Sequence, residues 1–163
     1  MTPDSLTKAI EHRSAGEFAE AETLLKQMID TGTQDGSIYY HMAWTCDAQG
    51  KEREAVPYYE TAIRLGLPDE NLRGALLGLG STYRALGEYK KSAEILKQGV
   101  AQFPEAAEFP VFLAMALYNL HQPAEALGLL LKTLVKTSQN DGIIRYQKAI
   151  LFYHDKLDET WDT

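Results

Sequence analysis

A short motif recurs along this chain and constrains its fold more than any other feature of the sequence. The motif reads Gly-x-Phe/Glu/Tyr-x-x-Ala/Ser, and its three clearest copies begin at Gly16, Gly50 and Gly87. These glycines are 34 and 37 residues apart. A fourth copy at 120–126 lacks the glycine, but its last residue, Ala126, lies 34 residues after Ser92. A period of this length is typical of stacked helical hairpins.

The third copy shows why each repeat should be a helical hairpin. Leu76, Leu79, Gly80 and Tyr83 follow the i, i+3, i+4, i+7 spacing of one helix face. Gly87 is placed to end that helix, because glycine tolerates a positive φ. A second amphipathic run follows and ends before Pro104, since proline cannot continue a helix. The spacing therefore predicts two helices joined by a tight turn.

Small residues recur on these helix faces and indicate where helices approach closely. They are Gly80, Ser92 and Gly99 in the third repeat, and Ala43, Ala55 and Ala62 in the second. Larger side chains such as Tyr83, Tyr89 and Leu96 alternate with them. Alternating small and large side chains is how adjacent helices interdigitate.

This pattern resembles the tetratricopeptide repeat (TPR) family. The motif residues are Leu79, Gly80, Tyr83, Gly87, Tyr89, Ser92, Leu96, Gly99 and Pro104 in the third repeat, with partial matches at Ala9, Gly16, Phe18, Ala21 and Leu25, at Ala43, Gly50, Ala55, Tyr59 and Ala62, and at Leu113, Ala114, Pro123, Ala126 and Leu130. The resemblance implies an all-α fold, a right-handed α-solenoid of about four hairpins with a C-terminal capping helix. One departure is His121, which stands where the turn glycine is expected.

Length and periodicity predict a single domain over 1–163. The repeats are expected at about 2–34, 36–69, 73–106 and 107–139, and the capping helix at about 141–156. Three extra residues between the second and third repeats, within 66–73, should lengthen a loop or the following helix.

Composition narrows the class of partner and the compartment. The net charge of −7 and pI of about 5.1 argue against nucleic acid, because an acidic chain repels phosphates. The first eight residues lack the apolar segment of a signal peptide, and no apolar run reaches the ~18 residues of a membrane span. Cys46 is the only cysteine, so no internal disulfide can form. A cytoplasmic protein without membrane contact is expected.

The resemblance implies a concave groove lined by the first helix of each hairpin. Its positions are unusually apolar and aromatic, which favours docking of an apolar or aromatic segment of another polypeptide. The expected apolar anchors are Tyr40, Trp44, Met115 and Tyr118, the polar clamps are Arg13 and Arg84, and Ile10, His41 and Tyr146 complete the groove. Two alternatives remain: the cap helix or the Trp161 tail fills the groove, or the solenoid self-associates as a homodimer.

Catalytic and metal chemistry are not expected. The four histidines lie in different repeats without zinc-ligand spacing, and the glycines at 78–80 lack the lysine of a phosphate-binding loop. Cys46 is expected to be a buried structural thiol. The sequence thus predicts a non-enzymatic protein with no metal and no cofactor. His41 is expected at the groove edge near Trp44, where it could tune binding near pH 6.

Overall fold

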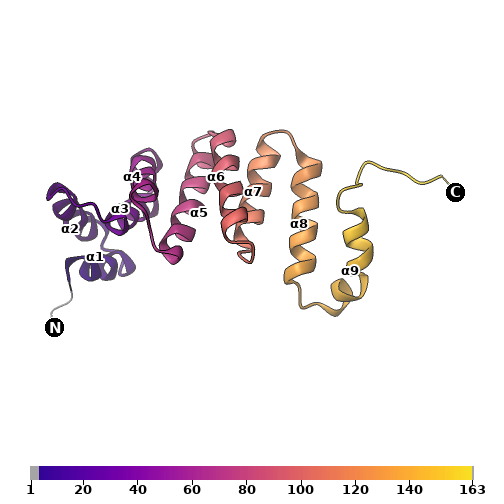
Figure 1. Cartoon of the computed structure of the whole chain (residues 1–163), viewed down its shortest axis with the longest axis horizontal. Helices are drawn as coiled ribbons and strands as arrows, with labels where there is room; N and C mark the ends of the chain where they lie inside the picture. Colours follow the sequence, from indigo (N-terminus) through magenta and orange to yellow (C-terminus); the bar gives the residue numbers. More distant parts are fainter. Residues whose placement is uncertain (1–3, 163) are drawn as a thin grey trace. The chain divides into compact units, whose positions relative to one another are not determined.

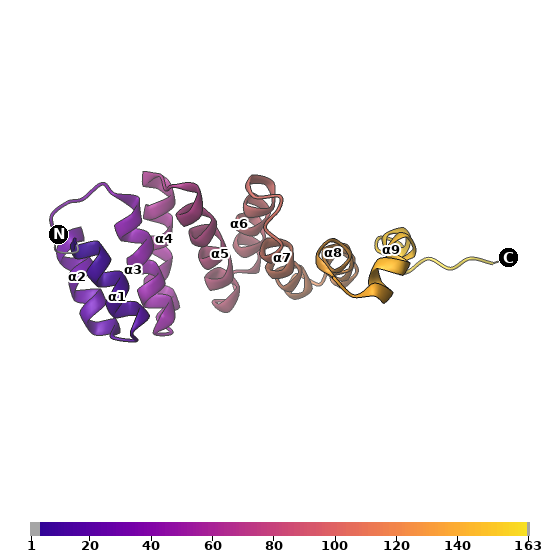
Figure 2. The same cartoon turned by 90° about the horizontal axis from the view of Figure 1, so that it is seen from below.

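The structure is a computed structural model that describes residues 4–162. All regular elements in this range are helices (Figures 1 and 2), which confirms the all-α prediction. They are α1 (Ser5–Ser14), α2 (Phe18–Asp30), α3 (Gly36–Ala48), α4 (Glu52–Leu65), α5 (Asp69–Ala85), α6 (Tyr89–Gln102), α7 (Glu108–Asn119), α8 (Pro123–Thr137) and α9 (Asp141–Tyr153). The chain divides into two compact units, unit 1 (Met1–Glu88) and unit 2 (Tyr89–Thr163).

The turns within hairpins share one backbone conformation. Gly16, Gly50 and Gly87 have φ values of 80°, 69° and 79°, and His121 follows them with φ 60°. In each case the amide of the next residue donates to the carbonyl five residues before it; for example, the Glu17 amide donates to the carbonyl of His12 at 2.8 Å. This bond closes the end of the first helix. His121 therefore takes the left-handed conformation that glycine provides in the other repeats, although a β-carbon disfavours it.

Unit 1 is built from α1 to α5, and each helix packs against the next. The first helices also meet, because α1 contacts α3 and α3 contacts α5. Ala9, Leu25, Ile38 and Met42 form a buried cluster between the first two hairpins. The extra residues of the third repeat lengthen α5, which at 17 residues is the longest described helix.

Unit 2 is built from α6 to α9, again with each helix packed against the next. Phe109 of α7 is fully buried and stacks on Phe103, with 6.0 Å between ring centroids. Gly99 of α6 faces Phe109 so closely that an added β-carbon would overlap the ring. Close helix approach at Gly99 is thus confirmed. The expected capping helix runs from 141 to 153, and no residue in it is buried.

The small residues of the motif lie inside the packed helices, as predicted. Ala21, Ala55 and Ser92 are inaccessible, and Ala126 nearly so. We expect Ala21→Leu to lower the free energy of unfolding by about 1–3 kcal/mol, because extra methylenes overpack a tight helix contact. Urea denaturation followed by circular dichroism measures this loss. Ala19→Leu is the matched control: Ala19 lies on the same helix but is exposed. Equal stability of the two variants would contradict the assigned packing.

Candidate functional site

Trp44 on α3 is the only exposed large hydrophobic side chain among the described residues of unit 1, with 44% of its surface accessible. Its ring is held by neighbours from its own helix. The Tyr40 ring lies one turn earlier at 5.8 Å, and the His41 ring stacks nearly parallel at 6.4 Å. Helical spacing places all three rings on adjacent faces of α3. Trp44 is thus a supported aromatic surface rather than a loose side chain.

Arg13 reaches this cluster from α1. Its guanidinium carbon lies 3.7 Å from the centroid of the Trp44 ring, which is a cation–π contact. Its Nη1 donates a hydrogen bond to Nδ1 of His41 at 2.9 Å. Arginine has no acceptor, so Nδ1 of His41 must carry a lone pair and the proton of the neutral ring lies on Nε2. The cluster therefore ties α1 to α3 through a charged group beneath an exposed tryptophan.

His41 is almost completely buried in this arrangement. Burial, followed by the charge of Arg13, lowers its pKa from 6.5 to about 4. The expectation that His41 titrates near pH 6 at a groove edge is therefore wrong. A neutral His41 acts as the acceptor that orients Arg13 throughout the physiological pH range.

Arg13 is itself buried, and no carboxylate is paired with it among residues 4–162. Burial lowers its pKa, but a guanidinium keeps its proton in proteins. No buried side-chain nitrogen or oxygen in the described part of the chain lacks a hydrogen-bond partner. The guanidinium nitrogens that have no partner in this part of the chain are therefore not completely enclosed, although Arg13 as a whole is only 8% exposed.

A second layer of side chains fixes this cluster from behind. The Tyr40 ring lies 6.4 Å from the Tyr59 ring of α4, and the Tyr59 hydroxyl donates to Oδ2 of Asp47 at 2.8 Å. The hydroxyl of Thr82 on α5 donates to Oδ1 of Asp47 at 2.9 Å. Burial raises the pKa of Asp47, and these two hydrogen bonds oppose the shift. One carboxylate thus links α3, α4 and α5 in a satisfied polar network.

Two glycines of α5 make room for these tyrosines, a role that helical periodicity alone does not indicate. A β-carbon at Gly74 would overlap the Tyr40 hydroxyl, and one at Gly78 would lie 2.6 Å from Cζ of Tyr59. Two glycines four residues apart inside a helix are costly for helix propensity. Glycines at these two helical positions therefore indicate, in the sequence itself, that side chains from other helices fill the space beside them.

The structure separates the expected groove residues into two groups. Arg13, Tyr40 and His41 come together around Trp44, but all three are buried and support the tryptophan from behind. Ile10 on α1 and Arg84 on α5 are half-buried in the same unit. Met115, Tyr118 and Tyr146 are exposed on helices of unit 2.

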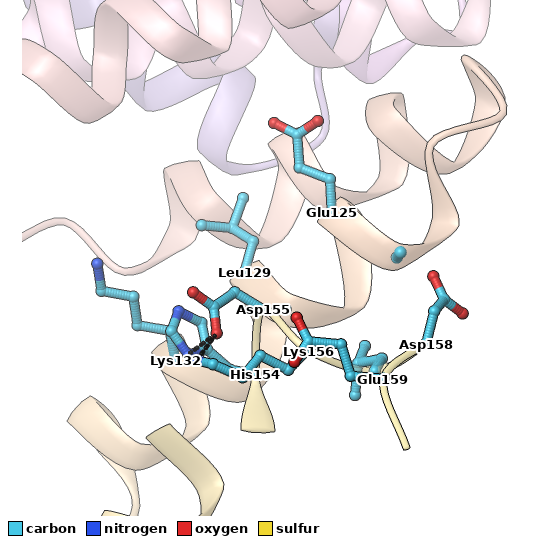
Figure 3. Close-up of a pocket in the computed structure, with 11 residues that line it drawn as sticks. Glu125, Leu129, Lys132, His154, Asp155, Lys156, Asp158 and Glu159 are labelled. Carbon is cyan, nitrogen blue, oxygen red and sulfur yellow. Dashed lines mark hydrogen bonds and ion pairs between the residues drawn. The ribbon is translucent and has the colours of Figure 1, made fainter. Parts of the chain in front are cut away.

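Three further features within residues 4–162 bear on chemistry: a cysteine thiol, the potential metal ligands and a pocket. Cys46 is inaccessible, and burial raises the pKa of its thiol to about 11, so it is a structural thiol as expected. No group of three histidine, cysteine or carboxylate side chains in the described ranges could hold a metal ion. A pocket of about 550 Å³ in unit 2 lies between α8 and the segment 154–159. Figure 3 shows it lined by charged groups of both signs, including Glu125, Lys132 and Asp158.

Comparison with known proteins places this architecture in a family. The family model described as Tetratrico peptide repeat matches residues 36–157. The chain belongs to the TPR family. Its fold is accordingly an all-α solenoid of TPR repeats, and members of this family generally act as non-enzymatic modules for protein–protein interaction. No curated protein sequence matches the chain significantly.

Solved structures of TPR proteins share this fold at low sequence identity. YrrB, described as a TPR protein with an unusual peptide-binding site, is 15% identical with a TM-score of 0.73, over 89% of this chain and 73% of its own. A MamA protein is 18% identical with the same TM-score, over 89% and 74%. MamA 41-end from Desulfovibrio magneticus RS-1 is 17% identical with a TM-score of 0.66, over 98% and 100%. At these identities the likeness shows the fold alone. No described helix of this TPR protein is long and apolar enough to cross a membrane.

Proposed function

We propose that this TPR protein is a non-enzymatic binding module whose unit 1 docks a segment of another polypeptide on Trp44. The observation that carries the proposal is an exposed tryptophan held in place by a buried cation. Most exposed side chains must lose rotamer freedom on binding, and that loss weakens affinity. The contacts of Trp44 with Arg13, Tyr40 and His41 have already restricted its ring. A rigid aromatic surface of this kind is a good binding anchor.

The same contacts indicate what the bound segment should offer. An apolar or aromatic side chain would pack on the open face of Trp44. A backbone carbonyl or carboxylate would accept from the free N–H groups of Arg13. Unit 1 carries fourteen acidic and eight basic side chains, so long-range attraction favours a segment with net positive charge. YrrB, a TPR protein of this fold, is described as having an unusual peptide-binding site, which supports a peptide as the ligand.

The residues expected on the other unit keep a secondary place in this proposal. Met115, Tyr118 and Tyr146 are exposed on α7 and α9 and would serve as contact points within unit 2 alone. The tail does not cover Tyr118, which keeps 68% of its surface accessible. Trp161 instead contacts Phe152 and Tyr153. The primary site is the Trp44 cluster, because there the supporting contacts lie within one compact unit.

A displayed random-peptide library selected on the wild-type protein tests the proposal. We expect the selected peptides to carry an aromatic or large aliphatic residue beside basic residues. Calorimetric titration of the best peptide should show at least about 30-fold weaker binding to Trp44→Ala, which corresponds to about 2 kcal/mol. Added salt should weaken binding as well.

Leu127→Ala provides the matched control for that experiment. Leu127 is about as exposed as Trp44 but lies on α8 in unit 2. The peptide should bind Leu127→Ala as tightly as the wild type. Peptides that bind Trp44→Ala and the wild type equally would exclude the Trp44 cluster as the docking site.

A further inference from the structure

The last repeat differs from the others at one core position. Leu25, Tyr59, Leu96 and Leu130 occupy the same place in successive second helices, at spacings of 34, 37 and 34 residues. The first three are almost completely inaccessible, whereas Leu130 keeps 38% of its surface exposed. Elsewhere within a unit, the following helix covers this position. α9 packs against α8 but leaves Leu130 partly exposed. The capping expected from the sequence is therefore incomplete.

α9 itself exposes a large apolar surface. Ile144 and Leu151 lie seven residues apart on one helix face and are exposed, and Phe152 and Tyr153 are about half exposed. The segment after α9 returns so that the Trp161 ring lies 5.9 Å from Phe152 and 5.4 Å from Tyr153. Phe152, Tyr153 and Trp161 contact one another, and we call them, together with the other exposed apolar side chains of α9 and the following segment, the terminal patch (Ile144, Leu151, Phe152, Tyr153, Leu157 and Trp161).

The size of the terminal patch matches a protein interface. Three half-exposed aromatic rings present about 300 Å² of apolar area. Three aliphatic side chains add roughly 200 Å². A contiguous apolar patch of several hundred Å² marks an interaction site, and a stable interface buries about 800 Å² per partner with its polar rim. The patch can therefore supply the apolar centre of a standard interface.

Charge indicates which partner fits. The acidity of this chain is concentrated in unit 1, whereas unit 2 carries nine acidic and eight basic side chains. The same elements carry exposed charges of both signs, with Arg145 and Lys148 on α9 and Asp158 and Glu159 in the following segment. A twofold pairing places each surface against its own copy, so a rim that carries both signs can complement itself. A nearly neutral unit also avoids the repulsion that a strongly charged one would meet.

We infer that the terminal patch is a homodimer interface in which α9 and the segment after it pack against the same elements of a second copy. The two α9 helices would bury Phe152, Tyr153 and Trp161 between them. This interface lies in unit 2 and does not depend on peptide docking at Trp44, so a dimeric protein presents two copies of that site.

Sedimentation velocity over an approximately hundredfold concentration range tests the inference, because mass action shifts a dimer equilibrium with concentration. We expect the wild type to pass from monomer to dimer as concentration rises. The double variant Phe152→Ser, Trp161→Ser should stay monomeric at concentrations at which the wild type is dimeric. Both side chains are half exposed, so the fold should survive, and circular dichroism with thermal unfolding checks this.

Tyr118→Ser is the matched control, because it removes a more exposed aromatic side chain from α7 outside the patch, and it should dimerise like the wild type. A second readout uses Trp44→Phe, which leaves Trp161 as the only tryptophan. Its fluorescence should shift to shorter wavelength as concentration rises, since dimerisation buries the ring. A wild type that is monomeric throughout, or a patch variant that dimerises normally, would overturn the inference.

Discussion

Replacing Phe109 by alanine is expected to lower the free energy of unfolding by about 3–5 kcal/mol, the range for loss of a large buried ring. Phe109 is fully inaccessible on α7, between the stacked ring of Phe103 and the backbone of Gly99 on α6. Alanine removes the apolar area and leaves a cavity that two packed helices cannot close. Urea denaturation followed by circular dichroism measures the loss as a lower midpoint at an unchanged slope.

Gly99 provides the internal control. The effect of Gly99→Ala on the free energy of unfolding should change sign with the residue at position 109. In the wild type, Gly99→Ala places a β-carbon within the Phe109 ring and should destabilise, although alanine is the better helix former. In the Phe109→Ala background the same change fills part of the cavity and should stabilise. Additive effects in this double-mutant cycle would mean that the two residues are not in contact.

A second large effect is expected when the free energy of unfolding is measured as a function of pH. His41 has a pKa of about 4 in the folded chain and an ordinary value of 6.5 when unfolded. Between these values the unfolded chain binds a proton that the folded chain does not, so stability is retained above pH 6.5 and declines as pH falls toward 4. The full difference is about 3 kcal/mol. The cause is burial of the ring, and then the charge of Arg13 beside it.

His41→Gln isolates this contribution, because glutamine can still accept from Arg13 but does not titrate. Denaturation midpoints at several pH values between 6.5 and 4 should fall more steeply for the wild type than for the variant. Asp47, whose pKa is raised by burial, contributes with the opposite sign in both proteins and cancels in the comparison. Parallel pH profiles of the two proteins would show that folding does not lower the pKa of His41, and would contradict the prediction.

The helices follow closely from the sequence, because their signals are local. The second helix of the third repeat was predicted to follow Gly87 and to end before Pro104, and α6 runs from Tyr89 to Gln102. Gly87 and Pro123 end or begin a helix through their own backbone geometry, which no distant residue needs to supply. The predicted end of the capping helix at 156 was three residues too long, since 154–156 form a turn after α9.

The candidate site could be located from the sequence but not described. Helical spacing places Tyr40, His41 and Trp44 within about one turn of α3. It does not indicate which of the three side chains is exposed. Which of them is buried depends on Arg13, 28 residues before His41, and on Gly74 and Gly78 of α5. Such contacts join residues far apart in the sequence, and periodicity along one helix carries no information about them.

Local signals are enough to predict that this chain is a series of TPR hairpins, because turn residues and the period of small side chains act over a few residues. They do not predict that Arg13 lies beneath Trp44, that His41 is neutral, or that α9 leaves Leu130 and its own aromatic side chains exposed. Burial and pKa depend on every helix that packs around a side chain. That environment exists only once distant parts of the chain have come together.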